Sequence, residues 1–517
     1  MTAFRADPAG PARGAPEGAP SLPPAPRDHG NLSTRLTVLL VVLGTGAGGV
    51  LRFAGIGHNS LWIDEAFSVY VGRQPLADLW RTTVHLDFHP PLYYALLHAW
   101  MAFGDGETAL RSLSALLSTL TLPVVFLIGA RLGGRVLGVA SCGLVALSPL
   151  QIAYAQQVRM YALMTFWAAL SILFLVQLLE GPGRRRNLSW AAFAVSTALT
   201  MLSHNTGVLL PVSIAVFVGI AWVRGPRPVP GLLAVATGLG AAVLLWLPWL
   251  PYFLSQAHRV DREFWISPPS WPTFLEHWHD MINAFGPEGG YRSVVLAAVV
   301  VLVGLGVRRL RPPLALLMLL LVLVPVAVEL LVSIRRPIFF TQTLVWTSVP
   351  FSILLTAGIL ALRARPVIAL VTAAVLVLNA TGIRGYYRDG QKEDWRDAAR
   401  YVSKHVRTGE QVLFSAAWAQ IPFDYYYGRL DGPPLTSHGL PTDVPESQAL
   451  EAKMTRADLA RLDRLTTGHP SVWVVYSHDW YTDPQELVRS RLNTTFRETD
   501  SRDFTDITVV HYRAGSD

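Results

Sequence analysis

Long apolar stretches without charged residues recur along the chain between residues 36 and 382, where a soluble protein would show periodic stripes of apolar and polar positions. A helix that crosses the ~30 Å hydrocarbon core of a bilayer needs about 20 largely apolar residues. The pattern therefore predicts eleven membrane-spanning helices, at residues 36–53, 112–130, 136–155, 160–179, 187–203, 206–223, 230–254, 293–307, 313–333, 343–362 and 366–382.

A further apolar run, at 90–104, has only 15 uncharged residues. Runs of that length are typical of re-entrant or interfacial segments, so we expect it not to span. The connections between the eleven spans then alternate in charge, and the positive-inside rule assigns the arginine-rich side to the cytoplasm. The N-terminus is therefore expected inside and the C-terminus outside. The arginines behind this assignment are Arg131, Arg135, Arg184, Arg185, Arg186, Arg224, Arg227, Arg308, Arg309, Arg311, Arg363 and Arg365.

The two ends of the chain differ from this middle part, 35–382, which is the predicted transmembrane domain. Residues 1–34 are rich in Pro, Ala and Gly, which is typical of a disordered tail. From 383 to 517 the composition is charged and polar, and alternating helix and strand signals predict a small extracytoplasmic α/β domain. The expected helices lie at 395–406 and 456–465, and the expected strands at 411–415, 471–476 and 507–512.

Composition excludes an ordinary soluble enzyme. Charged residues make up 15% of the chain, where a soluble domain carries about 25%, and the mean hydropathy is +0.35. The net charge of +7 comes almost entirely from arginines beside apolar runs, which indicates membrane topology rather than nucleic-acid binding. The single cysteine, Cys142, excludes an internal disulfide and a cysteine-based metal site. We therefore expect a multi-pass protein of the cell membrane, with the lipid bilayer as a partner and no nucleic acid.

The first outer loop, at 54–111, carries two adjacent carboxylates, Asp64 and Glu65, near the expected membrane surface. Carboxylates beside hydrocarbon are costly to desolvate and commonly have a partner or a task. The alternative is a solvated pair that favours the N-terminal dipole of a helix. Further along, His89 precedes two prolines that suit the first turn of a helix. Such a helix start favours phosphate binding, although a simple loop-to-helix cap would have the same pattern.

Four other ionisable residues fall at the expected outer surface. Arg159 joins the third and fourth spans, where a guanidinium suits a phosphate or extends to the lipid headgroups. His204, at the end of the fifth span, is weakly informative by itself. Glu107 and Arg111 are four residues apart, which predicts an ion pair along one helix. Because no P-loop, GxSxG, Rossmann or metal-ligand spacing is present, carboxylate, histidine and arginine at one membrane surface indicate a lipid-linked phosphate donor.

Three motifs in order carry a resemblance to a known family. They are Trp-x-Asp-Glu at 62–65, Asp-x-His-Pro-Pro-Leu-Tyr-Tyr at 87–94 and Gln-x-x-Arg-Met-Tyr-Ala-Leu at 156–163. Together they resemble the bacterial dolichyl-phosphate-mannose-protein mannosyltransferase and aminoarabinose transferase family, a family-39-like branch of the GT-C glycosyltransferases. The likeness extends from residue 36 to about 350, and Lys-Glu-Asp-Trp-Arg-x-Ala-Ala at 392–399 is similar to the start of the outer domain in many members. A GT-C-like bundle of about 11 spans is implied.

The resemblance also implies a chemistry. The donor is a polyprenyl-phosphate sugar, and the catalytic aspartate matches Asp64, which would take the proton from an acceptor hydroxyl in an inverting single displacement. Glu65 would orient Asp64 or bind a divalent cation, and no other cofactor is implied. The acceptor is left open as a glycan, a lipid or a protein. The expected phosphate contacts are His89, Arg159, Arg335 and Arg336, and the expected substrate-lining residues are Trp62, Asp87, Tyr93, Tyr161 and His204.

The chain departs from the family pattern in two respects. In the loop 337–343, Gln342 stands where an arginine is usual, so Arg335 or Arg336 is expected to replace that phosphate contact. The carbohydrate-binding repeats of eukaryotic protein mannosyltransferases are missing, so a protein acceptor is not implied.

Two functions of other classes stay open at this point: a lipid or solute transporter or flippase without chemistry, and a membrane-anchored module that binds a glycan. Transporters commonly have paired broken helices and polar groups at the bilayer midplane. In this chain the ionisable groups gather at one surface instead, which favours the glycosyltransferase.

Overall fold

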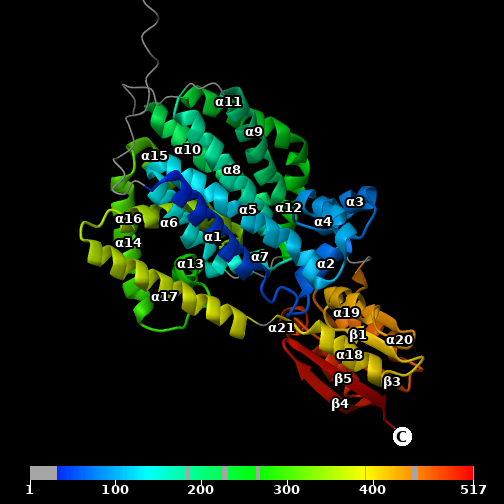
Figure 1. Cartoon of the computed structure of the whole chain (residues 1–517). Coiled ribbons are helices and arrows are strands. Elements are labelled where there is room, and N and C mark those ends of the chain that lie inside the picture. Colours follow the sequence, from blue (N-terminus) through cyan, green and yellow to red (C-terminus); the bar gives the residue numbers. More distant parts are fainter. Residues whose placement is uncertain are drawn as a thin grey trace, which may run out of the picture.

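The computed structural model describes residues 32–181, 186–223, 231–263, 268–390, 392–444 and 452–515. Most of the predicted tail, together with Arg184, Arg185, Arg224 and Arg227, lies outside the described residues. The described chain forms a helical body from which a smaller lobe, containing the only β-sheet of the described ranges, extends at one end (Figure 1).

Nine helical segments in the described ranges are long and apolar enough to cross a membrane, and a bent pair makes a tenth candidate. In the bent pair, α6 and α7 meet at 59°. The nine are α1 (Thr34–Phe53), α5 (Glu107–Gly133), α8 (Tyr161–Leu179), η2 with α10 (Asn205–Val223), α11 to α12 (Leu232–Arg259), α14 (Tyr291–Arg309), α15 (Pro312–Ser333), η4 with α16 (Thr341–Ile359) and α17 (Arg365–Asp389); the pair is α6 (Arg135–Ala146) and α7 (Pro149–Ala155). The predicted fold class is thereby confirmed.

The remaining predicted span, at 187–203, is the helix α9 (Arg186–Ser203), which packs between α8 and α11. It contains five Ser and Thr residues and is not among the helices that are apolar enough to count as candidate spans. The count of eleven therefore stays a prediction. The short run at 90–104 forms α4 (Leu92–Trp100) and η1 (Met101–Phe103), which together are too short to cross a bilayer.

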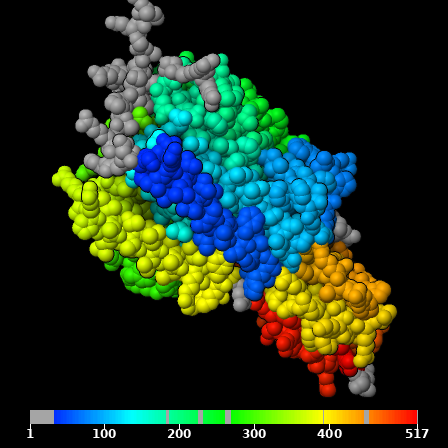
Figure 2. Space-filling model, in the orientation of Figure 1, coloured from blue at the N-terminus to red at the C-terminus, as the bar shows by residue number. Residues whose placement is uncertain are grey.

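The body has a buried centre and lipid-facing outer helices. The apolar window of the segment containing α16 is 89% buried, whereas that of α1 is 17% and that of α17 is 11% buried. Figure 2 shows α1 lying across the surface of the body. Close packing at the centre depends on glycine: a Cβ at Gly358 of α16 would lie 1.8 Å from the backbone oxygen of Leu302 in α14. Small residues let membrane helices approach in this way.

The first loop forms three helices at the end of the body that faces the lobe (Figure 1). They are α2 (Ile63–Gly72), α3 (Leu76–Leu86) and α4. Leu61 and Val69 of this loop share one buried apolar cluster with Trp395 and Phe414 of the lobe. Because this apolar core is continuous, the lobe and the first loop pack as one structural unit.

The lobe contains a five-stranded sheet in the order β2-β1-β3-β5-β4. β1 (Gln411–Phe414) lies between β2 (Thr436–Gly439) and β3 (Ser471–Tyr476) in parallel, whereas β5 (Ile507–Ala514) is antiparallel to both β3 and β4 (Phe496–Phe504). The helices of the lobe are α18 (Trp395–His405), α19 (Gln420–Tyr427), α20 (Leu459–Thr466), α21 (Asp479–Thr482) and α22 (Leu487–Leu492).

The sequence predicted the central strands of this sheet but not its two edges. β3 is buried along its whole length, so it reads as an apolar run. β2 and β4 are polar edge strands; seven of the nine residues of β4 are exposed. Without an apolar pattern they carry no strand signal, and polar edges of this kind protect a sheet from pairing with other chains.

Candidate active site

Asp64 and Arg159, which lie 95 residues apart, meet at the end of the body. Asp64 is in the first turn of α2, and its side chain is 40% exposed. Arg159, between α7 and α8, is buried, and its Nη2 lies 3.6 Å from Asp64 Oδ2 while its Nη1 donates to the Asp64 backbone oxygen at 3.4 Å. The Nε of Arg159 is buried without a hydrogen-bond partner in the described residues. The result is an accessible carboxylate beside a buried cation.

Two histidines and a tyrosine line up next to this pair. The ring centroids of His89 and His204 are 4.8 Å apart, and those of His204 and Tyr161 are 5.7 Å apart. His89 Nδ1 lies 2.9 Å from Asp87 Oδ1, which also accepts from the Phe88 backbone N–H at 2.7 Å. Burial by itself raises the pKa of Asp87, but the neighbouring His89 and Tyr94 outweigh burial and lower it. Asp87 is therefore an anion that orients the His89 ring.

The hydrogen bonds of His204 determine which of its nitrogens carries the proton. Its Nδ1 accepts the backbone N–H of Thr206 at 3.1 Å. Burial and the nearby charges of His89 and Arg159 hold the pKa of His204 well below its usual value, so the ring is neutral. Because Nδ1 is an acceptor, the neutral ring has its proton on Nε2. His204 is thus a neutral donor beside the cation Arg159.

Glu65, the second carboxylate, is completely buried. Its oxygens accept from Arg111 Nε at 2.8 Å and Nη2 at 2.7 Å, from the Val158 N–H at 2.8 Å and from Lys392 Nζ at 3.0 Å. Burial by itself raises the pKa of this carboxyl, but Arg111 and Lys392 outweigh burial and lower it to about 2. With every contact directed at protein groups, Glu65 is placed to orient the loop.

The expected ion pair between Glu107 and Arg111 is wrong. Arg111 turns into the buried site of Glu65 and also donates to the backbone oxygens of Ile56, Asn59 and Ser60. Glu107 instead pairs with Arg396 of the lobe at 2.7 Å. The physical reason is burial: a fully buried carboxylate needs a partner far more than one at the surface, so the tertiary contact replaces the weak helical one.

The segment 392–396, shortly after α17, holds the first loop in a way that the sequence did not reveal. Glu393 Oε2 accepts the N–H of Ile63, the first residue of α2, at 3.1 Å. Ser60 donates to the Glu393 backbone oxygen, and the Trp395 N–H donates back to Ser60 Oγ at 3.2 Å. In the sequence these residues stand out only as a charged segment after the last apolar run, and no pattern connects that segment with the first loop.

Other predicted site residues have different surroundings. Tyr93 is fully buried, with its hydroxyl 3.4 Å from Ser114 Oγ, which in turn donates to the Arg159 backbone oxygen at 3.3 Å. Trp62 is half-buried at the start of α2. Arg335 is exposed just beyond α15, and Arg336 beside it is half-buried. Tyr93 therefore supports the Arg159 backbone, and the phosphate roles of Arg335 and Arg336 stay predictions.

A divalent cation does not fit the groups around Asp64. Within the described ranges no set of three His, Cys, Asp or Glu side chains is placed to hold a metal ion. The partner that faces Asp64 is the guanidinium of Arg159, which repels a cation. No chemical step is therefore derived through a metal.

Comparison with known proteins finds a family match over part of the chain. Residues 88–252, which include His89, Arg159 and His204, match the family model described as dolichyl-phosphate-mannose-protein mannosyltransferase. A protein of Aquifex aeolicus described only as uncharacterized is 25% identical over 237 residues, which make up 44% of each chain. This chain thus aligns with less than half the length of that relative.

Solved structures extend the match to nearly the whole chain. The apo structure of ArnT from Cupriavidus metallidurans has a TM-score of 0.61 at 15% identity, over 92% of this chain and 98% of that one. The same protein bound to undecaprenyl phosphate gives a TM-score of 0.57 at 15% identity, over 93% and 98%. An oligosaccharyltransferase from Archaeoglobus fulgidus gives 0.55 at 11% identity, over 87% and 70%. The chain therefore has the GT-C glycosyltransferase fold, which confirms the resemblance.

Proposed function

We propose that this protein transfers a sugar from a polyprenyl-phosphate donor to an acceptor hydroxyl at the outer face of the membrane. The observation that carries the proposal is the half-exposed carboxylate of Asp64 beside the buried cation Arg159, with His89 and His204 next to them. A base, a phosphate-binding cation and two further donors are the groups that such a reaction requires. The GT-C fold and a relative bound to undecaprenyl phosphate support the choice of donor.

The transfer would proceed as a single displacement with inversion. The acceptor oxygen forms a bond to the anomeric carbon, the bond from that carbon to the phosphate oxygen breaks, and the acceptor proton passes to Asp64. A base in hydrogen-bond reach contributes ~10²- to 10⁴-fold to the rate. The larger part of the rate enhancement must come from positioning the two substrates and from stabilising the charge that develops on the departing phosphate.

The surrounding residues divide these tasks between them. Arg159 presents a guanidinium, which binds a phosphate in two places at once. His89, oriented by Asp87, and the Nε2–H of His204 would donate to the remaining phosphate oxygens. Glu65 touches neither substrate in this scheme; it is a positioning residue that fixes α2 and hence Asp64 through Arg111 and Lys392.

The proposal is tested with the full-length protein in lipid nanodiscs. The protein is incubated with polyprenyl-phosphate donors that carry different labelled sugars, together with a membrane extract as the source of acceptors. We expect one donor to lose its labelled sugar to a product while free polyprenyl phosphate accumulates. Donors that all stay intact would contradict the proposal: movement of intact donor between the leaflets of proteoliposomes would indicate a transporter, and retention without reaction a binding module.

A further inference from the structure

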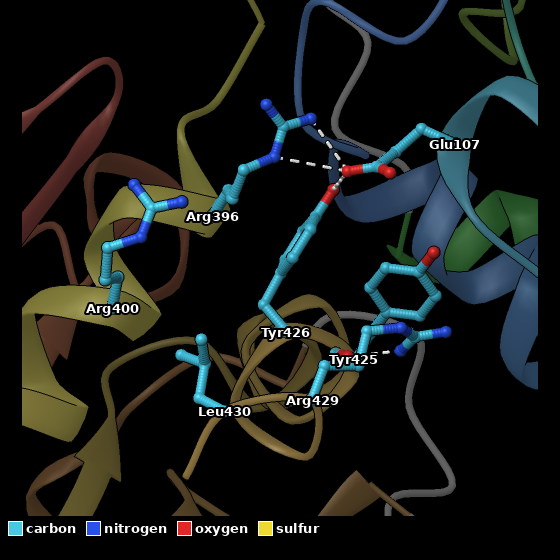
Figure 3. Close-up of a pocket in the computed structure, with 7 residues that line it drawn as sticks. All are labelled: Glu107, Arg396, Arg400, Tyr425, Tyr426, Arg429 and Leu430. Carbon is cyan, nitrogen blue, oxygen red and sulfur yellow. Dashed lines mark hydrogen bonds and ion pairs between the residues drawn. The ribbon is translucent and has the colours of Figure 1, made fainter. Parts of the chain in front are cut away.

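A second polar pocket lies where the lobe meets the membrane-embedded body. It encloses about 200 Å³ and is lined by Glu107, Arg396, Arg400, Tyr425, Tyr426, Arg429 and Leu430. Figure 3 shows Arg396 and Arg400 projecting from α18 on one side, residues 425–430 on the other, and Glu107 from the start of α5. Three arginines against one carboxylate make the lining cationic, although two tyrosines and a leucine contribute most of the remaining wall.

Two of the arginines form the frame of the pocket. Arg396 donates to Glu107 Oε1 at 2.7 Å and to backbone oxygens of His58 and Gly57. Arg429 pairs with Asp105 at 2.7 Å and lies 3.7 Å from the centre of the Tyr425 ring. Because both guanidiniums are held by carboxylates of the protein itself, they set the shape of the pocket.

The third arginine is available to a ligand. Arg400 is on the exposed rim, and its ion pair in the described structure is with Asp397, one turn earlier on the same helix; the two side chains are 47% and 50% exposed. Exposed pairs of this kind contribute little because water competes for both partners. Arg400 can therefore exchange Asp397 for an anion that enters the pocket.

The Tyr426 side chain connects the pocket to the backbone just before α2. The Tyr426 hydroxyl accepts the backbone N–H of Leu61 at 2.6 Å and donates to Glu107 Oε1 at 3.0 Å. Leu61 is three residues before Asp64. A molecule held against Tyr426 and Glu107 would thus touch the structure that positions the proposed base.

We propose that this pocket binds an acidic saccharide, with a sugar carboxylate on Arg400 and sugar hydroxyls on Glu107. The volume corresponds to about six or seven liquid waters at ~30 Å³ each, which is the space of one sugar ring. Arginine matches the planar carboxylate, and the carboxylate of Glu107 accepts hydroxyl protons. The choice of a saccharide over other anions rests on the proposed function, since a protein that glycosylates an acidic glycan would need such a contact outside its catalytic centre.

The test measures binding and requires neither donor nor transfer. Full-length protein in nanodiscs of neutral lipid is titrated with trigalacturonate, with its neutral methyl ester and with inorganic phosphate. We expect trigalacturonate to bind and the other two to bind at least about tenfold more weakly, which is the loss of one charge-assisted contact. Equal binding of the methyl ester, tighter binding of phosphate, or no binding of trigalacturonate would overturn the proposal.

Two variants assign the binding to this pocket. Arg400→Gln removes the exchangeable cation, and Leu430→Trp fills the pocket without changing its charge. Each variant should weaken the binding of trigalacturonate about tenfold or more. Arg464→Gln, an exposed arginine on α20 of the same lobe, is the matched control and should leave binding unchanged. Wild-type binding by both pocket variants, each with an unaltered unfolding transition, would place the ligand elsewhere. Since sugar transfer is assayed separately, failure of this site leaves the proposed transferase activity to its own test.

Discussion

The ammonium of Lys392, which follows the last apolar helix, lies 3.0 Å from the buried carboxylate of Glu65 in the first loop. The two residues are 327 positions apart, so the contact joins the first loop of the predicted transmembrane domain to the start of the predicted C-terminal domain. Lys392 Nζ also donates to the Gln156 backbone oxygen at 3.2 Å, close to the segment that carries Arg159. Asp64, the proposed base, and Arg159, the proposed phosphate ligand, are therefore held next to one buried charge network.

That network predicts a loss of transfer in alkaline solution. Burial lowers the pKa of Lys392 to about 8, although Glu65 opposes this. An ammonium is charged below its pKa, so its pair with Glu65 is intact at neutral pH and is lost as the pH rises through about 8. The rate of transfer should fall over that range in the wild-type protein. In Lys392→Arg the fall should shift to higher pH, because a guanidinium keeps its charge.

The measurement is the initial rate of transfer across the neutral and alkaline range. Lys404→Arg, at an exposed lysine of α18, is the matched control and should keep the wild-type profile. Identical profiles for the wild type and Lys392→Arg would show that the alkaline limb, if present, belongs to another group.

Asp64→Asn should abolish transfer while expression and donor binding stay normal. Asparagine keeps the size of the side chain and one acceptor oxygen but cannot take a proton. The expected loss is at least the ~10²- to 10⁴-fold contribution of a general base. Asp78→Asn, at an exposed aspartate of α3 that pairs only with Arg81 in the described structure, is the control and should be neutral. Rapid turnover by Asp64→Asn would mean that the base has been assigned wrongly.

A single displacement also predicts what happens without an acceptor. Donor alone should leave no sugar covalently attached to Asp64, because no glycosyl-enzyme is formed. Mass spectrometry of protein digested after incubation with donor provides the measurement, and a glycosylated peptide containing Asp64 would replace the inverting mechanism with a double displacement.

His89→Ala and Arg159→Ala should weaken use of the donor by about 10- to 100-fold, since each removes a charged hydrogen bond worth ~1.5 to 3 kcal/mol. His85→Ala and Arg81→Gln alter exposed residues of the same loop and should have no effect. Donor titrations of transfer by the purified variants provide the measurement. Unchanged donor kinetics in both His89→Ala and Arg159→Ala would leave these residues with a structural role alone.

A reporter fused after Arg186 should read cytoplasmic, and one fused after Arg262 or at the C-terminus should read external. The expectation follows from the alternation of arginine-rich and arginine-poor connections. The same orientation is needed for the catalytic loop and the lobe to lie on one side of the membrane, where α2 packs against α19. An external signal after Arg186 would contradict both the count of eleven spans and the proposed outer location of the site.

The apolar pattern of the sequence was enough to predict a helical protein with many candidate membrane spans. Apolar runs locate the spanning helices because a helix in lipid must satisfy its own backbone hydrogen bonds and present apolar side chains for about 20 residues. The same reasoning found β3, whose residues are all buried. It also predicted that Asp64, His89 and Arg159 lie at one membrane surface, because each is at the end of a predicted span or in the loop between two spans.

Only the tertiary structure decided which charged residues are partners. Local spacing favoured Glu107 with Arg111, yet Arg111 joins Glu65 and Glu107 joins Arg396. Pairing of this kind depends on burial: a carboxylate removed from water must find a cation wherever the chain places one, and a cation 46 or 289 residues away carries no periodic signal. The same holds for Lys392, whose role follows from the packing of the lobe against the first loop, because hydropathy specifies lengths and faces but not the neighbours of a side chain.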